Sequence, residues 1–306
     1  MGYSEDALRF ATIPTGEQVR FSDRISFAYL DRAKIVQSET GVVAIDERAR
    51  RAIAVPASSI AVVALGPGTS ITHAAAASIT ACGATIIWTG GEGYRLYAAG
   101  TPLTSSARWA QAQARMWAHR PSRVAAAKAL YLARFPDHVL PGNVRIATLR
   151  ALEGAEVKAA YRRLAKSHGV SFKRDTKNED PVNTSLNIAN GILYGLAASV
   201  CASLGLSPAL GVIHEGNAKA FLFDLADAFK LETSVPAAFE TAKEDDPVTA
   251  VRRSLRRRIR RGRVMDRMLG LTMRILEPHL REDAGDRLID DREDGVEGHT
   301  NYGTEA

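Results

Sequence analysis

Cysteine is scarce in this sequence of 306 residues, which contains only Cys82 and Cys201. The two lie far apart in apolar surroundings, without a CxxC pair or a metal-ligand spacing. This pattern predicts buried, reduced thiols and favours a cytoplasmic protein, because disulfides persist mainly outside the cytoplasm. The hydrophobic content of 46% and the length give room for roughly two domains with a sizeable core, so we expect folding without disulfides.

Export and membrane signals are also lacking. The first ten residues, MGYSEDALRF, have neither a basic region nor an apolar region, and Asp6 breaks the myristoylation pattern. One uncharged run, residues 181–213, is long enough to suggest a membrane span. Its serines, asparagines and Pro208 favour a buried core helix followed by a loop. We therefore expect no membrane partner.

The net charge of +6 hides a strong asymmetry. Residues 282–306 hold nine acidic and two basic residues, which leaves +13 on residues 1–281. Composition of this kind predicts a disordered acidic tail. A folded part this basic suggests a polyanionic partner such as nucleic acid, although a solvated charged surface is the simpler alternative.

The pattern of apolar residues changes near residue 100. Before it, short β-branched and apolar runs predict strands at 24–30, 41–46, 51–56, 59–65, 84–90 and 94–100, with a helix at 71–82. After it, apolar residues recur every three to four positions, which predicts helices. We expect an α+β fold with a β-rich N-terminal domain (1–103), an all-helical domain (104–281) and the acidic tail (282–306).

A glycine-containing turn, GPGTS at residues 66–70, stands between a predicted strand and a predicted helix. Glycines there would let backbone amides approach a phosphate. The stretch lacks the third glycine of a dinucleotide fingerprint, and no GK[ST] follows it. The favoured interpretation is a tight turn with Thr69 or Ser70 as the helix N-cap.

The stretch HEGNAKAFLFDLADAFK at residues 214–230 carries Asp224 and Asp227 on a mostly apolar helix. Carboxylates three residues apart on a helix project side by side and repel unless something positive lies between them. Alone, such a pair is often the solvated edge of a helix. The apolar neighbours here predict burial, where unpaired aspartates are rare. Arginines or a metal ion are the candidate partners.

His214 and Glu153 are candidates for further metal ligands, because a hard divalent ion takes about six. His214 lies between Gly211 and Gly216, which suggest a loop, and alone its simplest interpretation is a core histidine. Glu153 precedes Gly154, a helix-weakening residue that permits close approach of a backbone or a ligand. Considered alone, Glu153 is most simply interpreted as an exposed glutamate in a charged helix.

An arginine cluster, VRRSLRRRIRRGR, has eight arginines among the twelve residues 252–263. Val251, Leu255 and Ile259 form a thin apolar stripe, and no acidic residue interleaves to neutralise the charge. Arginine suits bidentate phosphate contacts, so this segment predicts salt-sensitive DNA binding. The expected phosphate contacts are Arg252, Arg256 and Arg260 on one face, with Arg162 and Arg163 as weaker candidates.

Four positions together resemble a known family. Glu153 in LEG, His214 in VIHEG, and Asp224 and Asp227 in FLFDLADAFK are similar in order and setting to the signature of the CRISPR-associated spacer-acquisition integrases, the first-numbered protein of those immune systems. GPGTSITHAAA, GYRLYAAGTP and DPVNTSLNIANGILYG extend the resemblance over roughly residues 15–270. The compact N-terminal region resembles subtype I-E. The acidic tail has no counterpart in the family pattern.

The resemblance implies a β-rich domain joined to a helical catalytic domain, in homodimers that flank a dimer of a small second adaptation protein. It implies that Glu153, His214 and Asp227 hold Mg²⁺ or Mn²⁺, with Asp224 as a direct ligand or as a residue that orients one. The implied activity joins 3′-hydroxyl ends of double-stranded spacer fragments to the repeat array by transesterification, with endonuclease activity. The alternatives are a hydrolytic metal-dependent nuclease and a non-catalytic DNA-binding scaffold.

Overall fold

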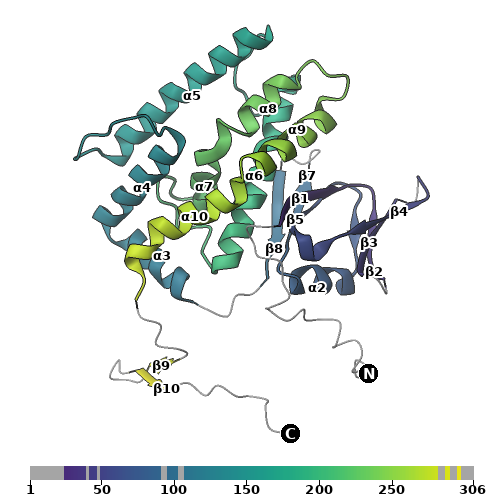
Figure 1. Cartoon of the computed structure of the whole chain (residues 1–306), viewed down its shortest axis with the longest axis horizontal. Helices are drawn as coiled ribbons and strands as arrows, with labels where there is room; N and C mark the ends of the chain where they lie inside the picture. The colour runs from purple at the N-terminus through teal and green to yellow at the C-terminus, as the bar shows by residue number, and fades with distance from the viewer. Residues whose placement is uncertain are drawn as a thin grey trace.

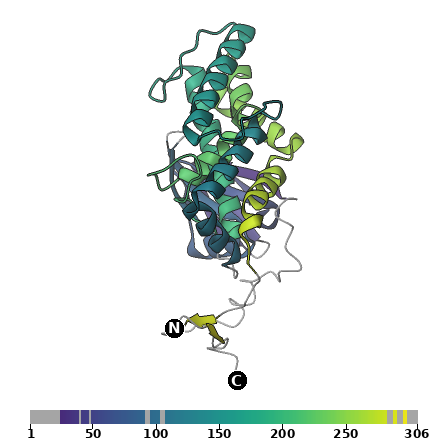
Figure 2. The same cartoon turned by 90° about the vertical axis from the view of Figure 1, so that its left-hand side faces the viewer.

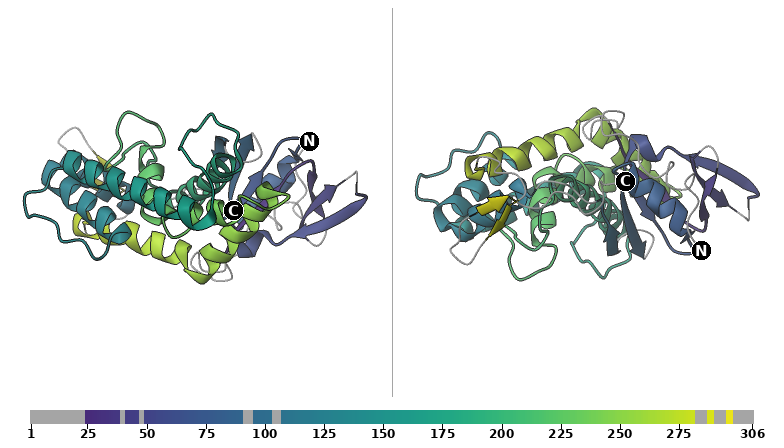
Figure 3. Two further views of the ribbon diagram at one scale, coloured as in Figure 1. Left: turned by 90° about the horizontal axis from the view of Figure 1, so that it is seen from above. Right: turned by 90° about the horizontal axis from the view of Figure 1, so that it is seen from below.

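The computed structural model describes residues 24–38, 41–46, 49–90, 95–102, 107–281, 287–289 and 295–297. Strands between residues 25 and 100 precede helices between 108 and 276, and the two kinds of element lie at opposite ends of the molecule (Figures 1 and 3). The predicted α+β class is therefore confirmed. The predicted domain boundary after residue 103 falls within 103–106, outside the described residues.

The first sheet has the strand order β1-β5-β7-β8, with strands Ile25–Leu30, Ile60–Leu65, Thr85–Gly90 and Arg95–Gly100. β1, β5 and β7 pair in parallel, and β8 returns antiparallel to β7. Every residue of β5 is buried. A strand covered on both faces needs apolar residues at every position, which explains the unbroken run IAVVAL.

The second sheet has the order β4-β3-β2-β6, with strands Arg51–Val55, Gly41–Asp46, Lys34–Ser38 and Ser70–Ile71. β2 and β6 were not predicted, because KIVQS is partly polar and β6 has only two residues. Helix α2 (His73–Ala81) packs on both sheets. Its N-cap is Thr72, whose hydroxyl accepts from the Ala75 N–H at 3.3 Å, so the prediction of Thr69 or Ser70 was wrong.

A short 3₁₀ turn, η3 (Ala57–Ser59), lies between β4 and β5. Eight α-helices follow β8 in the described chain, and a second 3₁₀ turn, η5 (Glu277–His279), comes directly after the last of them. Their bounds are α3 Arg108–Ala118, α4 Arg120–Arg134, α5 Ile146–His168, α6 Pro181–Leu204, α7 Ala220–Lys230, α8 Ser234–Glu240, α9 Pro247–Arg261 and α10 Val264–Leu276.

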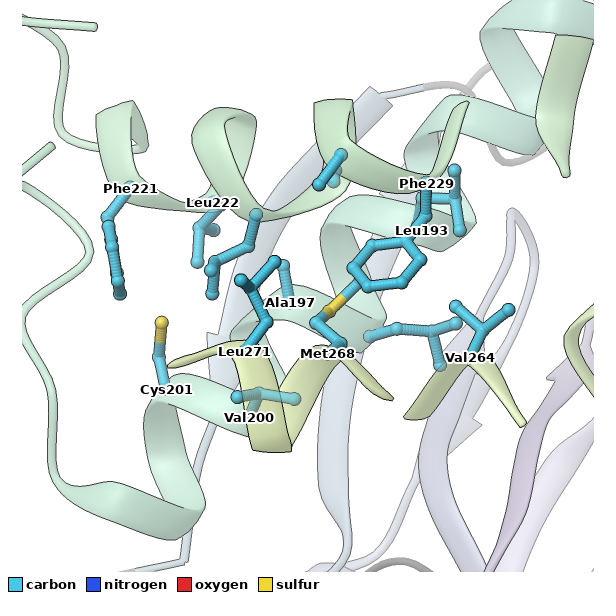
Figure 4. Close-up of a cluster of buried hydrophobic side chains, with 14 of the residues drawn as sticks. Leu193, Ala197, Val200, Cys201, Phe221, Leu222, Phe229, Val264, Met268 and Leu271 are labelled. Carbon is cyan, nitrogen blue, oxygen red and sulfur yellow. The ribbon is translucent and has the colours of Figure 1, made fainter. Parts of the chain in front are cut away.

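Helix α6 is the centre of the helical part. Asp180 caps its start and Gly205 ends it in the left-handed conformation. It is long and apolar enough to cross a membrane by length and composition, yet 83% of its most apolar window is buried inside the protein. α7 and α10 cover it with an apolar cluster that includes Leu193, Phe229 and Met268 (Figure 4). The predicted core helix is confirmed, and both cysteines are buried and free, as expected.

The helices and the first sheet share one apolar core. α6 crosses β7 at Gly195, where a Cβ would come 2.5 Å from Ile87 Cδ1. Nearby, the Ser199 hydroxyl donates to the Ala61 carbonyl at 3.1 Å. Because glycine permits this approach, α6 is fixed directly against the sheet, and it positions the helices that carry the candidate site.

The acidic tail contains two described strands, β9 (Arg287–Ile289) and β10 (Gly295–Glu297), which pair antiparallel. They lie apart from the sheets and helices (Figures 1 and 2). The prediction of a disordered tail did not include these two three-residue strands, RLI and GVE. The rest of that prediction lies outside the described residues.

Candidate active site

Asp224 of α7 is buried, with 2% of its surface exposed. Its carboxylate accepts the backbone N–H groups of Val212, Ile213 and His214 at 2.5, 3.0 and 3.1 Å. His214 Nδ1 lies 2.7 Å from the same carboxylate. These donors compensate the burial of the charge and occupy both of its oxygens. Asp224 thus fastens the loop before α7 to that helix.

The loop folds back on α7 because Gly211 has no side chain. A Cβ at this position would collide with the His214 carbonyl oxygen and with Ala220. The Phe221 N–H donates to the Pro208 carbonyl at 2.8 Å, and this bond closes the turn. The sequence predicted a loop here, and the structure explains why it returns to the helix.

His214 is held in one orientation. Its ring meets Phe223 edge-on with centroids 5.7 Å apart, and 36% of its side chain is exposed. The hydrogen bond with Asp224 raises the pKa of His214 above 6.5, against the opposing effect of burial. Because the carboxylate accepts from Nδ1, the neutral ring presents its lone pair at Nε2, which is the arrangement of a positioned metal-binding histidine.

Glu153 of α5 pairs with Arg134 of α4, and both side chains are largely buried. Burial raises the pKa of Glu153; Arg134 opposes this rise and Asp227 adds to it. Asp227 is therefore close enough to Glu153 for their charges to repel. The interpretation of Glu153 as an exposed surface residue is wrong.

Asp227 faces Lys230 of its own helix, with Nζ 2.5 Å from Oδ1. This close contact makes Lys230 the counter-ion of the Asp227 carboxylate. Lys230 Nζ also lies 2.7 Å from the Tyr194 hydroxyl. Burial alone would lower the pKa of Lys230, but Asp227 and Tyr194 outweigh it and raise the pKa.

One small cavity brings these groups together. It is lined by Leu130, Tyr131, Arg134, Phe135, Glu153, Ile213, Asp224, Asp227 and Ala228. His214 follows the lining residue Ile213, and its charge interacts with all three carboxylates. The sequence prediction therefore grouped residues that are neighbours in space. Arg134 and Lys230 were missed, because no pattern along the chain shows which cation will face which carboxylate.

The donors fit a hard divalent ion by their chemistry. Two carboxylates and one imidazole suit Mg²⁺ or Mn²⁺. In the part of the chain that the structure describes, however, no three His, Cys, Asp or Glu side chains converge closely enough to chelate an ion. Arg134 and Lys230 face Glu153 and Asp227 instead.

A basic groove opens beside His214. The end of α3, α4, residues 142–145, the start of α5 and residues 213–215 line it, and its cationic lining residues are Arg120, Arg123, Lys128, Arg145 and Arg150. Arg123 Nε donates to the Val212 carbonyl at 2.9 Å, and its guanidinium also meets Glu215 at 3.3 Å. Sequence analysis missed this groove because its arginines are spread over two helices rather than clustered in one run.

Helix α9 confirms the predicted apolar stripe, since Val251, Leu255 and Ile259 are buried. Its outer face forms a groove lined only by Arg253, Arg256, Arg257, Arg260 and Arg261, here called the arginine groove. Of the predicted phosphate contacts, Arg256 and Arg260 lie in it.

Arg252 does not lie in the arginine groove: it is half-buried, with its guanidinium carbon 3.7 Å from the ring centroid of Tyr29. Arg162 and Arg163 are exposed on α5, which packs on α8. Whether any of these arginines contacts DNA stays a prediction.

Comparison with known proteins decides the family. Residues 133–240 match the family model of CRISPR associated protein Cas1. The CRISPR-associated endonuclease Cas1 2 of Thermus thermophilus is 38% identical over 260 residues, which are 82% of this chain and 79% of that protein. The chain belongs to the Cas1 family. The resemblance to subtype I-E stays a prediction, because relatives from several organisms match.

Solved structures agree with this assignment. A crystal structure of a TtCas1–DNA complex superposes with a TM-score of 0.79 at 33% identity, covering 90% of this chain and 100% of the other. A casposase bound to an integration product has a TM-score of 0.67 at 12% identity, with 84% and 92% covered. At that identity the second likeness concerns the Cas1 fold alone.

Proposed function

We propose that this Cas1-family chain is a metal-dependent DNA integrase of CRISPR adaptation. It joins the 3′-hydroxyl ends of short double-stranded DNA fragments to the repeat array by transesterification, and it has DNA endonuclease activity. The observation that carries the proposal is that Glu153 and Asp227 line one cavity, while His214, held by Asp224, lines the basic groove beside it. Relatives named endonucleases and the DNA-bound TtCas1 support it.

In this proposal Glu153, Asp227 and His214 Nε2 hold Mg²⁺ or Mn²⁺. A bound ion would polarise a phosphoryl oxygen and stabilise charge on the attacking or leaving oxygen. Asp224 acts as a positioning residue rather than a ligand, because four donors already occupy its oxygens. It fixes the tautomer and the orientation of His214.

The chain itself supplies alignment and charge. A DNA 3′-hydroxyl attacks phosphorus directly, so the reaction needs no covalent nucleophile from the protein. Glu153 and Asp227 lie in a largely buried cavity, which limits the access of water as a competing nucleophile. Arg134 and Lys230 balance the carboxylate charges there before an ion binds.

Two basic surfaces hold the DNA backbone in this proposal. The groove beside His214 leads a strand to the cavity, and the arginine groove on α9 contacts phosphates elsewhere on the duplex. Both sets of contacts are with phosphates, so they position DNA and make its affinity depend on salt. We further propose that the protein acts in the cytoplasm as a homodimer with the small second adaptation protein.

Two alternatives use the same residues. A hydrolytic nuclease differs only in the attacking group, which is water. A DNA-binding scaffold is favoured by one specific observation, the pairing of Glu153 with Arg134 and of Asp227 with Lys230. Both carboxylates have side-chain cations and do not require a metal for charge balance.

An integration assay separates these functions. The chain and its small partner protein are mixed with a labelled duplex bearing 3′-hydroxyls and a supercoiled plasmid with a repeat array, in Mn²⁺, Mg²⁺ or chelator. We expect metal-dependent label on the plasmid, lost in Asp227→Ala. Shortened strands without joining would indicate hydrolysis, and DNA binding without any product would indicate a scaffold.

A further inference from the structure

Two buried cations face Glu153 and Asp227, the two carboxylates of the cavity that are not hydrogen-bonded by the loop before α7. The Arg134 side chain is 5% exposed and that of Lys230 is 15% exposed. Arg134 contacts Glu153, and Lys230 Nζ lies 2.5 Å from Asp227 Oδ1. Two unit charges thus oppose two unit charges, whereas the third carboxylate, Asp224, is fully occupied by the loop. Without these cations, both carboxylates would be buried and uncompensated, which is strongly unfavourable.

Lys230 has a second contact besides Asp227. Its Nζ lies 2.7 Å from the Tyr194 hydroxyl and 4.8 Å from the centroid of that ring. Both contacts come from α6 and do not involve the carboxylate. Lys230 can therefore leave Asp227 and still keep a hydrogen bond and a cation–π contact.

Arg134 is held less completely. Its guanidinium carbon lies 5.5 Å from the Phe135 ring centroid, and its buried Nε has no hydrogen-bond partner in the residues described. A buried guanidinium normally uses more of its five donors. The contact with Glu153 is its one ion pair in the described chain, so loss of that contact leaves Arg134 able to seek another anion.

We propose that Lys230 and Arg134 are resident counter-cations that stand in for the metal in the metal-free protein, and that a divalent ion binds by displacing them from Asp227 and Glu153. The inference rests on the proposed function in one respect, that these carboxylates bind an ion. A divalent ion carries the same charge as the two side chains that it displaces. The exchange thus keeps the carboxylates neutralised and leaves two cations beside the cavity for an anionic phosphate.

This competition has a measurable consequence. The site is competent for the ion only in the fraction of molecules whose carboxylates are released, and that fraction reduces the apparent affinity. Removal of one internal cation removes part of the competition. It also leaves one carboxylate uncompensated, so the metal-free protein should become less stable while the ion binds more tightly.

The test is calorimetric titration with Mn²⁺ alone on wild type, Lys230→Gln and Arg134→Gln, with circular dichroism as the check of folding. We expect each variant to bind Mn²⁺ about tenfold more tightly than wild type does, which corresponds to about a tenth of wild-type molecules having the carboxylates free to bind the ion. The rise in Tm on Mn²⁺ binding should also be larger for each variant than for wild type. Arg258→Gln removes a cation paired with Glu240 outside the cavity. It is the matched control and should bind as wild type does.

Unchanged or weaker Mn²⁺ binding by both folded variants, with wild type binding normally, would overturn the inference and leave the proposed metal site intact. No binding by any protein would overturn both. Binding only by the variants would support the inference. If the variants do not fold, Mn²⁺-soaked crystals of wild type decide: the inference predicts Lys230 Nζ beyond 4 Å from Asp227, and it fails if that ion pair persists beside a bound ion.

Discussion

Asp224 holds His214 by two bonds at once, from the backbone N–H at 3.1 Å and from Nδ1 at 2.7 Å. One carboxylate therefore sets both the path of the loop and the direction of the ring. The loop cannot shift along α7 without breaking the bond that orients the imidazole. Position and chemistry of the histidine are thus determined by the same buried group.

Asp224→Asn tests whether the Asp224 carboxylate both stabilises the loop and orients His214. An amide can accept only on one side, so at least one buried N–H of the loop loses its acceptor, and we expect a loss of about 1–3 kcal/mol in unfolding free energy. Loss of the orienting carboxylate should weaken Mn²⁺ binding by about 10–100-fold. Urea unfolding and Mn²⁺ titration measure the two effects.

The matched control is Asp246→Asn at the exposed N-cap of α9, whose carboxylate accepts from the Thr249 N–H at 3.0 Å. Asparagine caps helices about as well as aspartate, so stability and Mn²⁺ binding should stay near wild type. Equal losses at both positions would argue against a special role for Asp224.

Gly211→Ala should disturb the loop before α7 that Asp224 holds. The added Cβ meets backbone atoms of His214 and Ala220, and overpacking of this kind typically destabilises by about 1–3 kcal/mol. We expect weaker Mn²⁺ binding as well, because His214 moves with its backbone. The comparison is with Gly154→Ala on α5, where a Cβ meets nothing within 4 Å.

Gly154→Ala should stabilise the free protein by up to about 1 kcal/mol, since alanine is the better helix former. The sequence suggested that Gly154 permits a close approach, and the structure shows open space there rather than another backbone. Thermal unfolding of both glycine variants checks the pair of expectations. Destabilisation by Gly154→Ala would show that α5 is packed more tightly there than described.

The arginine groove predicts a salt effect. Replacement of Arg253, Arg257 and Arg261 with alanine should weaken DNA binding and reduce the slope of log K against log salt by about 2.7, at about 0.9 per phosphate contact. The predicted set of Arg252, Arg256 and Arg260 should reduce the slope less, because Arg252 packs over Tyr29. Fluorescence anisotropy with duplex DNA over a salt series measures the slopes.

A control for the groove uses arginines that already have carboxylate partners. Arg258 pairs with Glu240, and Arg267 Nη1 lies 2.9 Å from Glu232 Oε1. Alanine at both positions removes two positive charges outside the groove, so the salt slope should stay near wild type. A fall equal to that of the groove variant would mean that DNA senses net charge rather than this surface.

The sequence predicts those parts of the fold that depend on local pattern. The unbroken apolar run of β5 and the apolar stripe of α9, with one residue every four positions, each follow from burial on defined faces. β2 was missed because KIVQS mixes charged and polar residues with apolar ones, and its pairing with β3 rather than its composition makes it a strand. Long-range pairing is not visible in a short window.

In the candidate site, too, local sequence predicts some features, and others depend on how the helices pack. Burial of Asp224 follows from its apolar neighbours, and the sequence left open whether it binds metal or orients a ligand. The structure favours the second role because donors ten to twelve residues upstream occupy it. The pairing of Glu153 with Arg134 depends on how α4 and α5 pack. No local pattern encodes that contact, so it appears only in three dimensions.

The pH dependence of stability reports on the bond between His214 and Asp224. Because the pKa of His214 is raised on folding, the folded chain binds this proton more tightly than the unfolded chain does. The stabilisation is fully present below the unfolded value of about 6.5 and is lost as pH rises through the higher folded value. The comparison is made in chelator, from about pH 5.5 to about pH 8.5, which brackets the range in which histidine changes its charge. The difference in unfolding free energy between wild type and His214→Gln should therefore shrink as the pH rises. Asp224→Asn should flatten this profile, and a difference that grows with pH would contradict the assigned bond.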